Sequence, residues 1–297
     1  MIEVSNVTKT FGDFTALDQL TMTVPSGTVY GLVGPNGAGK STIIRHITGI
    51  YRQDTGTITV DGEPVYENPA VKSRIAYIPD DIFYFNTATI TDMAKFYAGV
   101  YPHFTMERFN TLHEAFDLDV KRPIRRFSKG MQKQAAFWLC MAMQPDILVL
   151  DEPVDGLDPV MRRQVWSIIM ADMAERGTTV LVSSHNLREL EDVCDHVGIM
   201  DHGKILLERS LSDMQENISK VLIALPDGVE LPTGLNIVHH SATGRLQTLI
   251  LRGSQEELMA RLAGAQPLFM DVVPLTLEEI FIYELGGVNY EVKDIIV

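Results

Sequence analysis

Hydrophobic and polar residues alternate with a period of two near the start of the chain, which is the pattern of half-buried strands. This pattern predicts strands at residues 2–7 and 20–24, followed by a wholly apolar strand at 29–33. Residues 42–48 then follow a helical period, and residues 57–66 have the pattern of a hairpin. The first part of the chain is therefore predicted to be a mixed sheet around a strand, loop and helix unit.

The pattern changes along the rest of the chain. Residues 79–145 follow a helical period, and apolar strands resume at 147–150 and 179–183, each followed by a helix. This alternation is typical of a parallel sheet with crossover helices. Shorter strands and two helices follow. We therefore expect an α/β domain over residues 1–214, with a helical subdomain at about 79–145, and a small α+β domain over 215–297.

Composition and charge narrow the function classes. Apolar residues make up 45% and charged residues 22% of the 297 residues, as in ordered globular proteins. With 25 basic and 39 acidic residues the net charge is −14, which disfavours nucleic acid as a partner. Cys140 and Cys194 lie in apolar helical patterns, which predicts buried, reduced thiols and fits the cytosol. We see no secretory signal and no apolar stretch of about 20 residues, so any membrane part is expected on another chain.

The strongest chemical signal is a glycine-rich loop between the predicted strand at 29–33 and the helix at 42–48. It fits the pattern G-x-x-x-x-G-K-[ST], in which main-chain NH groups surround phosphate oxygens at a helix N-terminus. Lys40 is expected to reach the terminal phosphates, and the Ser41 hydroxyl is expected to bind Mg²⁺. The residues predicted to bind nucleotide here are Gly34, Pro35, Asn36, Gly37, Ala38, Gly39, Lys40, Ser41 and Thr42.

A second signal is the apolar strand at 147–150, which ends in Asp151 and Glu152. Parallel sheets bind their ligands at the carboxyl ends of the strands. Asp151 is expected to hold Mg²⁺, directly or through water, and Glu152 is expected to polarise the attacking water. A strand that ends in two acids is weak evidence alone, but beside a phosphate loop it indicates ATP hydrolysis.

The residues between and after these two motifs resemble the ABC transporter ATPase family over about residues 2–210. Residues 127–131, Phe-Ser-Lys-Gly-Met, resemble the signature loop of the family, and residues 156–159, Gly-Leu-Asp-Pro, resemble its dimer-contact loop. His185 is similar to the switch histidine, and Phe11 is similar to the aromatic residue that stacks on adenine. The fold that this implies is a P-loop NTPase core of the ABC ATPase type with a helical subdomain, plus the small C-terminal α+β domain.

The resemblance implies ATP and Mg²⁺ as cofactors and a head-to-tail dimer of ATPase subunits, either identical or different. Each ATP would lie between the phosphate loop of one subunit and the signature loop of the other. Ser128 and the main chain of Gly130 would contact the γ-phosphate from the partner subunit, Asp158 belongs to the dimer contact, and His185 would help hold the closed site. The implied location is cytoplasmic, peripheral at the inner face of the cell membrane, on a separate transmembrane permease.

Three positions depart from the family. Asp80, followed by Asp81, stands where the family has a glutamine that touches magnesium and relays motion of the permease. A carboxylate can also bind Mg²⁺, so Asp80 is a candidate metal ligand. It adds negative charge beside the triphosphate, so we expect it to alter the rate of ATP turnover. Lys129 and Met131 replace a glycine and a glutamine of the signature, a variation that resembles bacterial ABC exporter subunits.

Two further segments bear on the partner. Residues 83–104 contain seven aromatic residues, in the region where the family receives a short helix of the membrane partner, and their exposed members are expected to form an apolar docking patch. Residues 274–281 resemble the closing helix of ATPases from bacterial exporters with a separate permease.

These observations predict a transport ATPase of an exporter. A soluble ABC ATPase is the first alternative, but such proteins carry a second cassette or a long coiled-coil insertion, and neither is visible. A slow nucleotide-gated module is the second alternative, because Asp80 is expected to affect turnover; Glu152 and His185 favour hydrolysis.

Overall fold

A computed structural model describes residues 1–285 except 217 and 227, and these residues form two compact units. Unit 1 consists of Met1–His185 and Val193–Glu208, and unit 2 consists of Asn186–Asp192 and the described residues from Arg209 onward. The expected boundary between residues 214 and 215 remains a prediction; in the structure the chain enters unit 2 first at Asn186 and again at Arg209.

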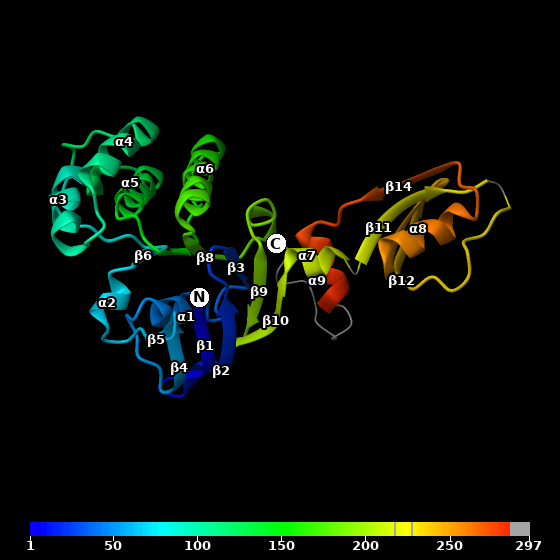
Figure 1. Cartoon of the computed structure of the whole chain (residues 1–297), viewed down its shortest axis with the longest axis horizontal. Helices are drawn as coiled ribbons and strands as arrows, with labels where there is room; N and C mark the ends of the chain where they lie inside the picture. Colours follow the sequence, from blue (N-terminus) through cyan, green and yellow to red (C-terminus); the bar gives the residue numbers. More distant parts are fainter. Residues whose placement is uncertain (217, 227, 286–297) are drawn as a thin grey trace. The chain divides into compact units, whose positions relative to one another are not determined.

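A six-stranded sheet forms the centre of unit 1 (Figure 1), with strand order β10-β9-β3-β8-β7-β6. Strands β6, β7, β8, β3 and β9 pair in parallel, and every residue of β3, β7 and β8 is buried. Such burial explains the continuous apolar runs in the sequence. The strands are β3 (Val29–Val33), β6 (Ile75–Ile78), β7 (Ile147–Asp151), β8 (Thr179–Ser184), β9 (His196–Asp201) and β10 (Lys204–Ser210).

A second, four-stranded sheet has the order β2-β1-β4-β5. Its side chains share one apolar core with helix α1 (Lys40–Ile47) and with β3, β7 and β8. This core holds the start of α1 against both sheets, which fixes the loop that precedes the helix. The elements are β1 (Ile2–Phe11), β2 (Phe14–Val24), β4 (Thr55–Val60) and β5 (Glu63–Pro64), followed by the short helix α2 (Pro69–Lys72).

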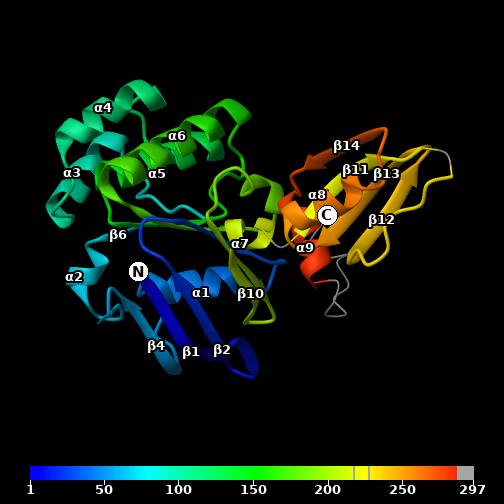
Figure 2. The same ribbon diagram turned by 45° about the vertical axis from the view of Figure 1, so that its right-hand side comes forward.

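The expected helical subdomain forms one end of unit 1 in both ribbon views (Figures 1 and 2). Trp138 is fully buried there, stacks on Phe109 with 4.6 Å between ring centroids, and donates its indole N–H to the Phe109 carbonyl at 2.7 Å. Cys140 is buried nearby, and burial raises the pKa of its thiol to about 12. The elements are α3 (Ile90–Val100), α4 (Met106–Phe116), η1 (Ile124–Arg126) and α5 (Lys129–Ala142), and helix α6 (Pro159–Arg176) follows β7.

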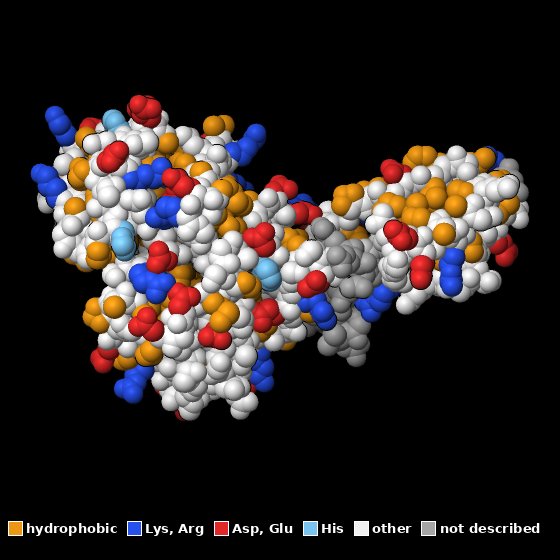
Figure 3. Space-filling model, in the orientation of Figure 1, with side chains coloured by type: hydrophobic (Ala, Val, Ile, Leu, Met, Phe, Trp, Pro, Cys, Tyr) orange, Lys and Arg blue, Asp and Glu red, His pale blue; other side chains and the backbone are white. Residues whose placement is uncertain are grey.

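Unit 2 is built on a four-stranded antiparallel sheet of order β12-β13-β11-β14. Helix α8 (Gln255–Ala263) buries Leu258 and Leu262 against the apolar side chains of this sheet. Hydrophobic side chains also gather on the face of this unit that is visible in Figure 3. The remaining elements are α7 (Leu211–Glu216), β11 (Ile218–Ala224), β12 (Ile237–Thr243), β13 (Leu246–Arg252), β14 (Phe269–Val273) and α9 (Leu277–Leu285).

A short segment from the middle of the chain also belongs to unit 2. Residues Asn186–Asp192 contain the 3₁₀ helix η2 (Leu187–Glu189), which lies against α9. The Arg188 guanidinium donates through Nε and Nη2 to Glu278 Oε2 at 3.0 and 2.9 Å. The main-chain N–H of Leu277 donates to Glu191 Oε1 at 3.0 Å. Helix α9 therefore holds the residues that directly follow His185.

Candidate active site

The glycine-rich loop lies between β3 and α1, as the sequence predicted. Gly39 caps the helix with a φ of 107°, and a Cβ at this position would lie 2.8 Å from the Ala16 carbonyl oxygen. A Cβ on Gly34 would overlap the main-chain carbonyl of Met200. Only glycine fits at these two places, because one needs a left-handed backbone and both are crowded by main chain. The loop thus presents its N–H groups at the N-terminus of α1, which suits a phosphate anion.

Lys40 is a buried cation at the first position of this helix, with 6% of its surface exposed. Its Nζ donates to the carbonyl oxygens of Gly34 at 2.6 Å and Pro35 at 3.3 Å, and it lies 3.5 Å from Glu152 Oε1. Burial of an ammonium group is unfavourable unless hydrogen bonds and an opposite charge offset it, and these contacts do so. The sequence placed Lys40 and Glu152 at one site, and the structure brings them together.

Hydroxyl and carboxylate oxygens meet beside the loop. Asp151, at the end of β7, has 2% of its surface exposed. Its Oδ1 accepts hydrogen bonds from Ser41 Oγ at 3.1 Å and from Ser183 Oγ at 2.7 Å. Ser183 lies opposite Asp151 in the parallel pairing of β7 and β8. Hard oxygen ligands of this kind are those that Mg²⁺ prefers, so Ser41 and Asp151 fit the expected metal.

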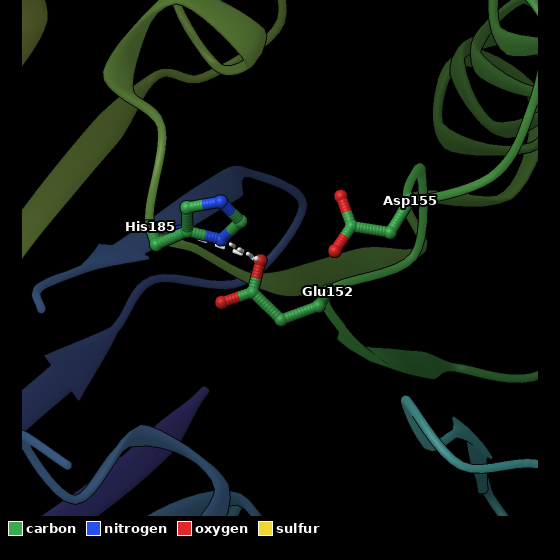
Figure 4. A group of neighbouring side chains, drawn as sticks. All are labelled: Glu152, Asp155 and His185. Atoms are coloured by element: carbon green, nitrogen blue, oxygen red, sulfur yellow. Dashed lines mark hydrogen bonds and ion pairs between the residues drawn. The ribbon is translucent and has the colours of Figure 1, made fainter. Parts of the chain in front are cut away.

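Glu152 and His185 form the second half of the site (Figure 4). Glu152 Oε2 lies 2.9 Å from His185 Nδ1 and accepts the main-chain N–H of His185 at 3.3 Å. Asp155 joins this pair, and the ligand atoms of all three side chains lie within 4.8 Å of one another. Asp155 was not predicted as a site residue, although the sequence has this third acid only three residues after Glu152.

A cavity of about 310 Å³ opens at the phosphate loop. Phe11 is not among its lining residues, whereas Phe14, at the start of β2, is. Phe11 instead packs edge-on against Tyr51, with ring centroids 5.8 Å apart. Adenine stacking on Phe11 therefore stays a prediction, and the structure adds Phe14 as a second aromatic candidate. The lining residues are Phe14, Ala16, Pro35, Asn36, Gly37, Gly39, Lys40, Ser41, Thr42, Asp80 and Glu152.

Asp80 lies at this cavity, two residues beyond the end of β6. Its side chain is 61% exposed, and its Oδ1 lies 3.5 Å from the Nζ of Lys133, a lysine of α5 that was not predicted as a site residue. On β6 itself, burial and then the negative charge of Asp151 raise the pKa of Tyr77 to about 12. The phenol of Tyr77 is therefore neutral beside these acids.

The signature and dimer-contact residues serve as helix caps within this chain. Ser128 caps α5 by accepting the Met131 N–H at 3.3 Å, and Asp158 caps α6 by accepting the Val160 and Met161 N–H groups at 3.0 Å each. Neither Ser128 nor Gly130 lines the cavity at the phosphate loop. Their expected contact with the γ-phosphate thus stays a prediction about a dimer.

Gly130 has a steric role that can be tested by replacing it with alanine. The added Cβ would lie 2.6 Å from the Gly156 carbonyl oxygen, so α5 and the loop after β7 would have to separate. We expect Gly130→Ala to lower the free energy of unfolding by roughly 1–3 kcal/mol in urea denaturation. Gly99→Ala is the matched control, because its Cβ would meet no atom of the described residues within 4 Å. An equal stability for both variants would contradict the close contact.

Comparison with known proteins agrees with this geometry. Residues 17–155 match the ABC transporter family model. The chain is 31% identical to the ABC transporter ATP-binding protein YtrB of Bacillus subtilis, over 97% of this chain and 99% of that protein. It is 32% identical to the Nod factor export ATP-binding protein I of Sinorhizobium fredii, over 99% and 87%.

Among solved structures, an ATP-binding subunit of an ABC transporter superposes with a TM-score of 0.68 at 26% identity, covering 72% of this chain and 92% of that chain. The expected fold class is thereby confirmed, and this chain also contains a C-terminal four-stranded sheet. The chain therefore belongs to the ATP-binding proteins of ABC transporters, and it is an ABC-type ATPase.

Proposed function

We propose that ATP hydrolysis by this chain drives export through a separate membrane permease. The observation that carries the proposal is the position of the Glu152 carboxylate. It lies 3.5 Å from the Lys40 ammonium, at a cavity lined by the phosphate loop, and is held by His185 at 2.9 Å. A base, a phosphate-binding cation and a loop of N–H groups at one place are what phosphoryl transfer to water requires.

The proposed roles follow from these contacts. Lys40 binds the terminal phosphates, while Glu152 orients the attacking water and accepts its proton. His185 holds the carboxylate through Nδ1 and contacts the γ-phosphate. Ser41 and Asp151 would hold Mg²⁺, with Asp80 as a further carboxylate at the cavity, and a metal bound there would neutralise phosphate charge.

A dimer completes the proposed site. The signature residues Ser128 and Gly130 do not line the cavity of their own chain, so a second subunit is needed to bring them to the nucleotide. Ser128 is exposed at the N-terminus of α5, where its hydroxyl and the following N–H groups suit a phosphate oxygen. The partner is either an identical chain or a related ATPase subunit.

The membrane part of the transporter is proposed to be a separate transmembrane chain, to which this chain binds in the cytoplasm at the inner face of the cell membrane. Among the described residues, no helix combines the length and the apolar character that a membrane span requires. A groove of about 350 Å³ lies beside the aromatic segment, lined in part by Tyr77, Tyr97 and Tyr101. Phe83, Phe85 and Phe96 are 77%, 60% and 51% exposed, so they supply apolar surface for a partner.

Replacing Phe83, Phe85 and Phe96 together by serine is expected to weaken permease binding at least about ten-fold, because three exposed apolar side chains are lost from the docking surface. The measurement is co-purification with the permease and titration in detergent. Phe269→Ser, which removes an aromatic residue of unit 2 that is 48% exposed, is the matched control. Unchanged binding by the triple variant would remove the aromatic segment from the interface.

The direct test of the function is phosphate release from ATP by the purified chain, with Mg²⁺ and with EDTA. Release that depends on Mg²⁺ supports the ATPase, and the export direction is then tested with the permease in vesicles. The resemblance of residues 274–281 to exporter ATPases and the name of the Nod factor export relative support that direction. If ATP binds without turnover, the slow nucleotide-gated module becomes the better account, with Asp80 as its cause.

A further inference from the structure

Lys133 is a second buried cation next to the active site, and it comes from the helical subdomain. It lies on α5 with 6% of its surface exposed. Its Nζ donates to the main-chain carbonyl oxygen of Glu152 at 2.7 Å and lies 3.5 Å from Asp80 Oδ1. One ammonium group therefore connects α5, the residue after β7 and the segment after β6.

The contact with Glu152 fixes an unusual backbone conformation. Glu152 has a φ of 46°, in the left-handed region that side chains other than glycine adopt at a cost. Such a conformation persists only where the surroundings hold it. The Glu152 N–H donates to Ser183 Oγ at 3.1 Å, and its carbonyl accepts from Lys133. Lys133 thus holds one of the two main-chain groups that aim the Glu152 side chain toward Lys40.

The contact of Lys133 with Asp80 affects the negative charge at the phosphate-loop cavity. Asp80 lines the phosphate-loop cavity, where a carboxylate repels a triphosphate. Lys133 places a positive charge 3.5 Å from that carboxylate and so offsets part of the repulsion. Asp80 and Lys133 also both line a second cavity, of about 280 Å³, next to the first. Asp80, which stands where the family has a glutamine, therefore has a counter-ion within the same chain.

We propose that Lys133 is a positioning residue for Glu152 and at the same time the counter-ion that makes Asp80 compatible with ATP. The inference rests on the proposed ATPase function, and it adds a direct connection between the helical subdomain and the general base. Movement of α5 would act on Glu152 through this one ammonium group.

The two roles predict different kinetic effects. Lys133→Met keeps the length of the side chain but removes its charge and its hydrogen bond. We expect kcat for ATP hydrolysis to fall about ten-fold or more, since small displacements of a catalytic group have large effects on rate. We also expect the Kd for ATP to rise several-fold, because Asp80 is left without its counter-ion.

The double variant Lys133→Met/Asp80→Asn separates these effects. Removing the carboxylate should return the Kd for ATP to nearly the wild-type value, whereas kcat should stay low because the Glu152 carbonyl still lacks its donor. Lys133→Arg keeps the positive charge on a side chain of different length and shape. It should therefore retain ATP affinity and lose part of kcat. Lys121→Met, at an exposed lysine of the helical subdomain, is the control for loss of a positive charge.

The measurements are steady-state phosphate release, calorimetric titration with ATP, and thermal unfolding of each variant. Wild-type values of kcat and Kd in Lys133→Met would overturn the inference, and so would a double variant that binds ATP as weakly as Lys133→Met does. If Lys133→Met does not fold, Lys133→Arg with unchanged kcat overturns the positioning role. Absence of turnover in the wild type would instead count against the proposed ATPase function.

Discussion

Replacing Glu152 by glutamine is expected to lower kcat for ATP hydrolysis by about a thousand-fold while leaving ATP binding intact. The amide has the size of the carboxylate but cannot accept the proton of the attacking water, and a general base contributes roughly 10²–10⁴ in rate. Because the γ-phosphate is no longer cleaved, the ATP-bound dimer should accumulate. Phosphate release and size-exclusion chromatography with ATP measure both effects.

Glu175→Gln is the matched control for this result, since Glu175 is an exposed glutamate on α6. It should hydrolyse ATP at the wild-type rate and should not accumulate as a dimer. Turnover of Glu152→Gln at the wild-type rate would show that another group accepts the proton. Asp155, which lies beside Glu152 and His185, would then be the first candidate.

Replacing Lys40 by methionine should weaken ATP binding by about a hundred-fold. The ammonium group is buried with 6% exposure, and hydrogen bonds to a charged group contribute about 1.5–3 kcal/mol each. Glu152 would also lose the cation 3.5 Å from its carboxylate, which increases its repulsion of the γ-phosphate. Calorimetric titration with ATP and with ADP measures the change.

Lys204→Met provides the comparison for Lys40→Met, because Lys204 forms an ion pair with Asp18 and is 57% exposed. Surface pairs of this kind contribute about 0–1 kcal/mol, so ATP affinity should be unchanged. If Lys40→Met bound ATP as tightly as the wild type, the loop between β3 and α1 would not be the phosphate site.

The sequence predicted the parts of the fold that follow from local patterns. The strand at 29–33 and the glycine loop are recognisable because a continuous apolar run and a fixed glycine spacing are both local. Strand β12 was not predicted, since every one of its residues is exposed and it has no buried face to give a periodic pattern. Strand β6 was missed for a different reason, because its four residues are too few to show a period.

The residues of the active site also divide into those that local sequence patterns predict and those that depend on tertiary contacts. Asp151 and Glu152 could be predicted because they end an apolar strand. Lys133 could not, since a lysine in a helix is usually solvent-exposed and its burial depends on a carbonyl 19 residues away. The choice between Phe11 and Phe14 likewise depends on how the turn between β1 and β2 lies over the cavity. Contacts of this kind are tertiary and leave no pattern in the local sequence.

The division of the chain into two units affects how the ATPase activity of a shortened protein should be interpreted. Residues Asn186–Asp192 belong to unit 2 although Val193–Glu208, which belong to unit 1, separate them from its other residues. A protein ending at residue 208 would lack Glu278 and Leu277, the partners of Arg188 and Glu191. The loop after His185 would then lose its support. Reduced turnover in such a protein would therefore not show that the C-terminal sheet takes part in the reaction.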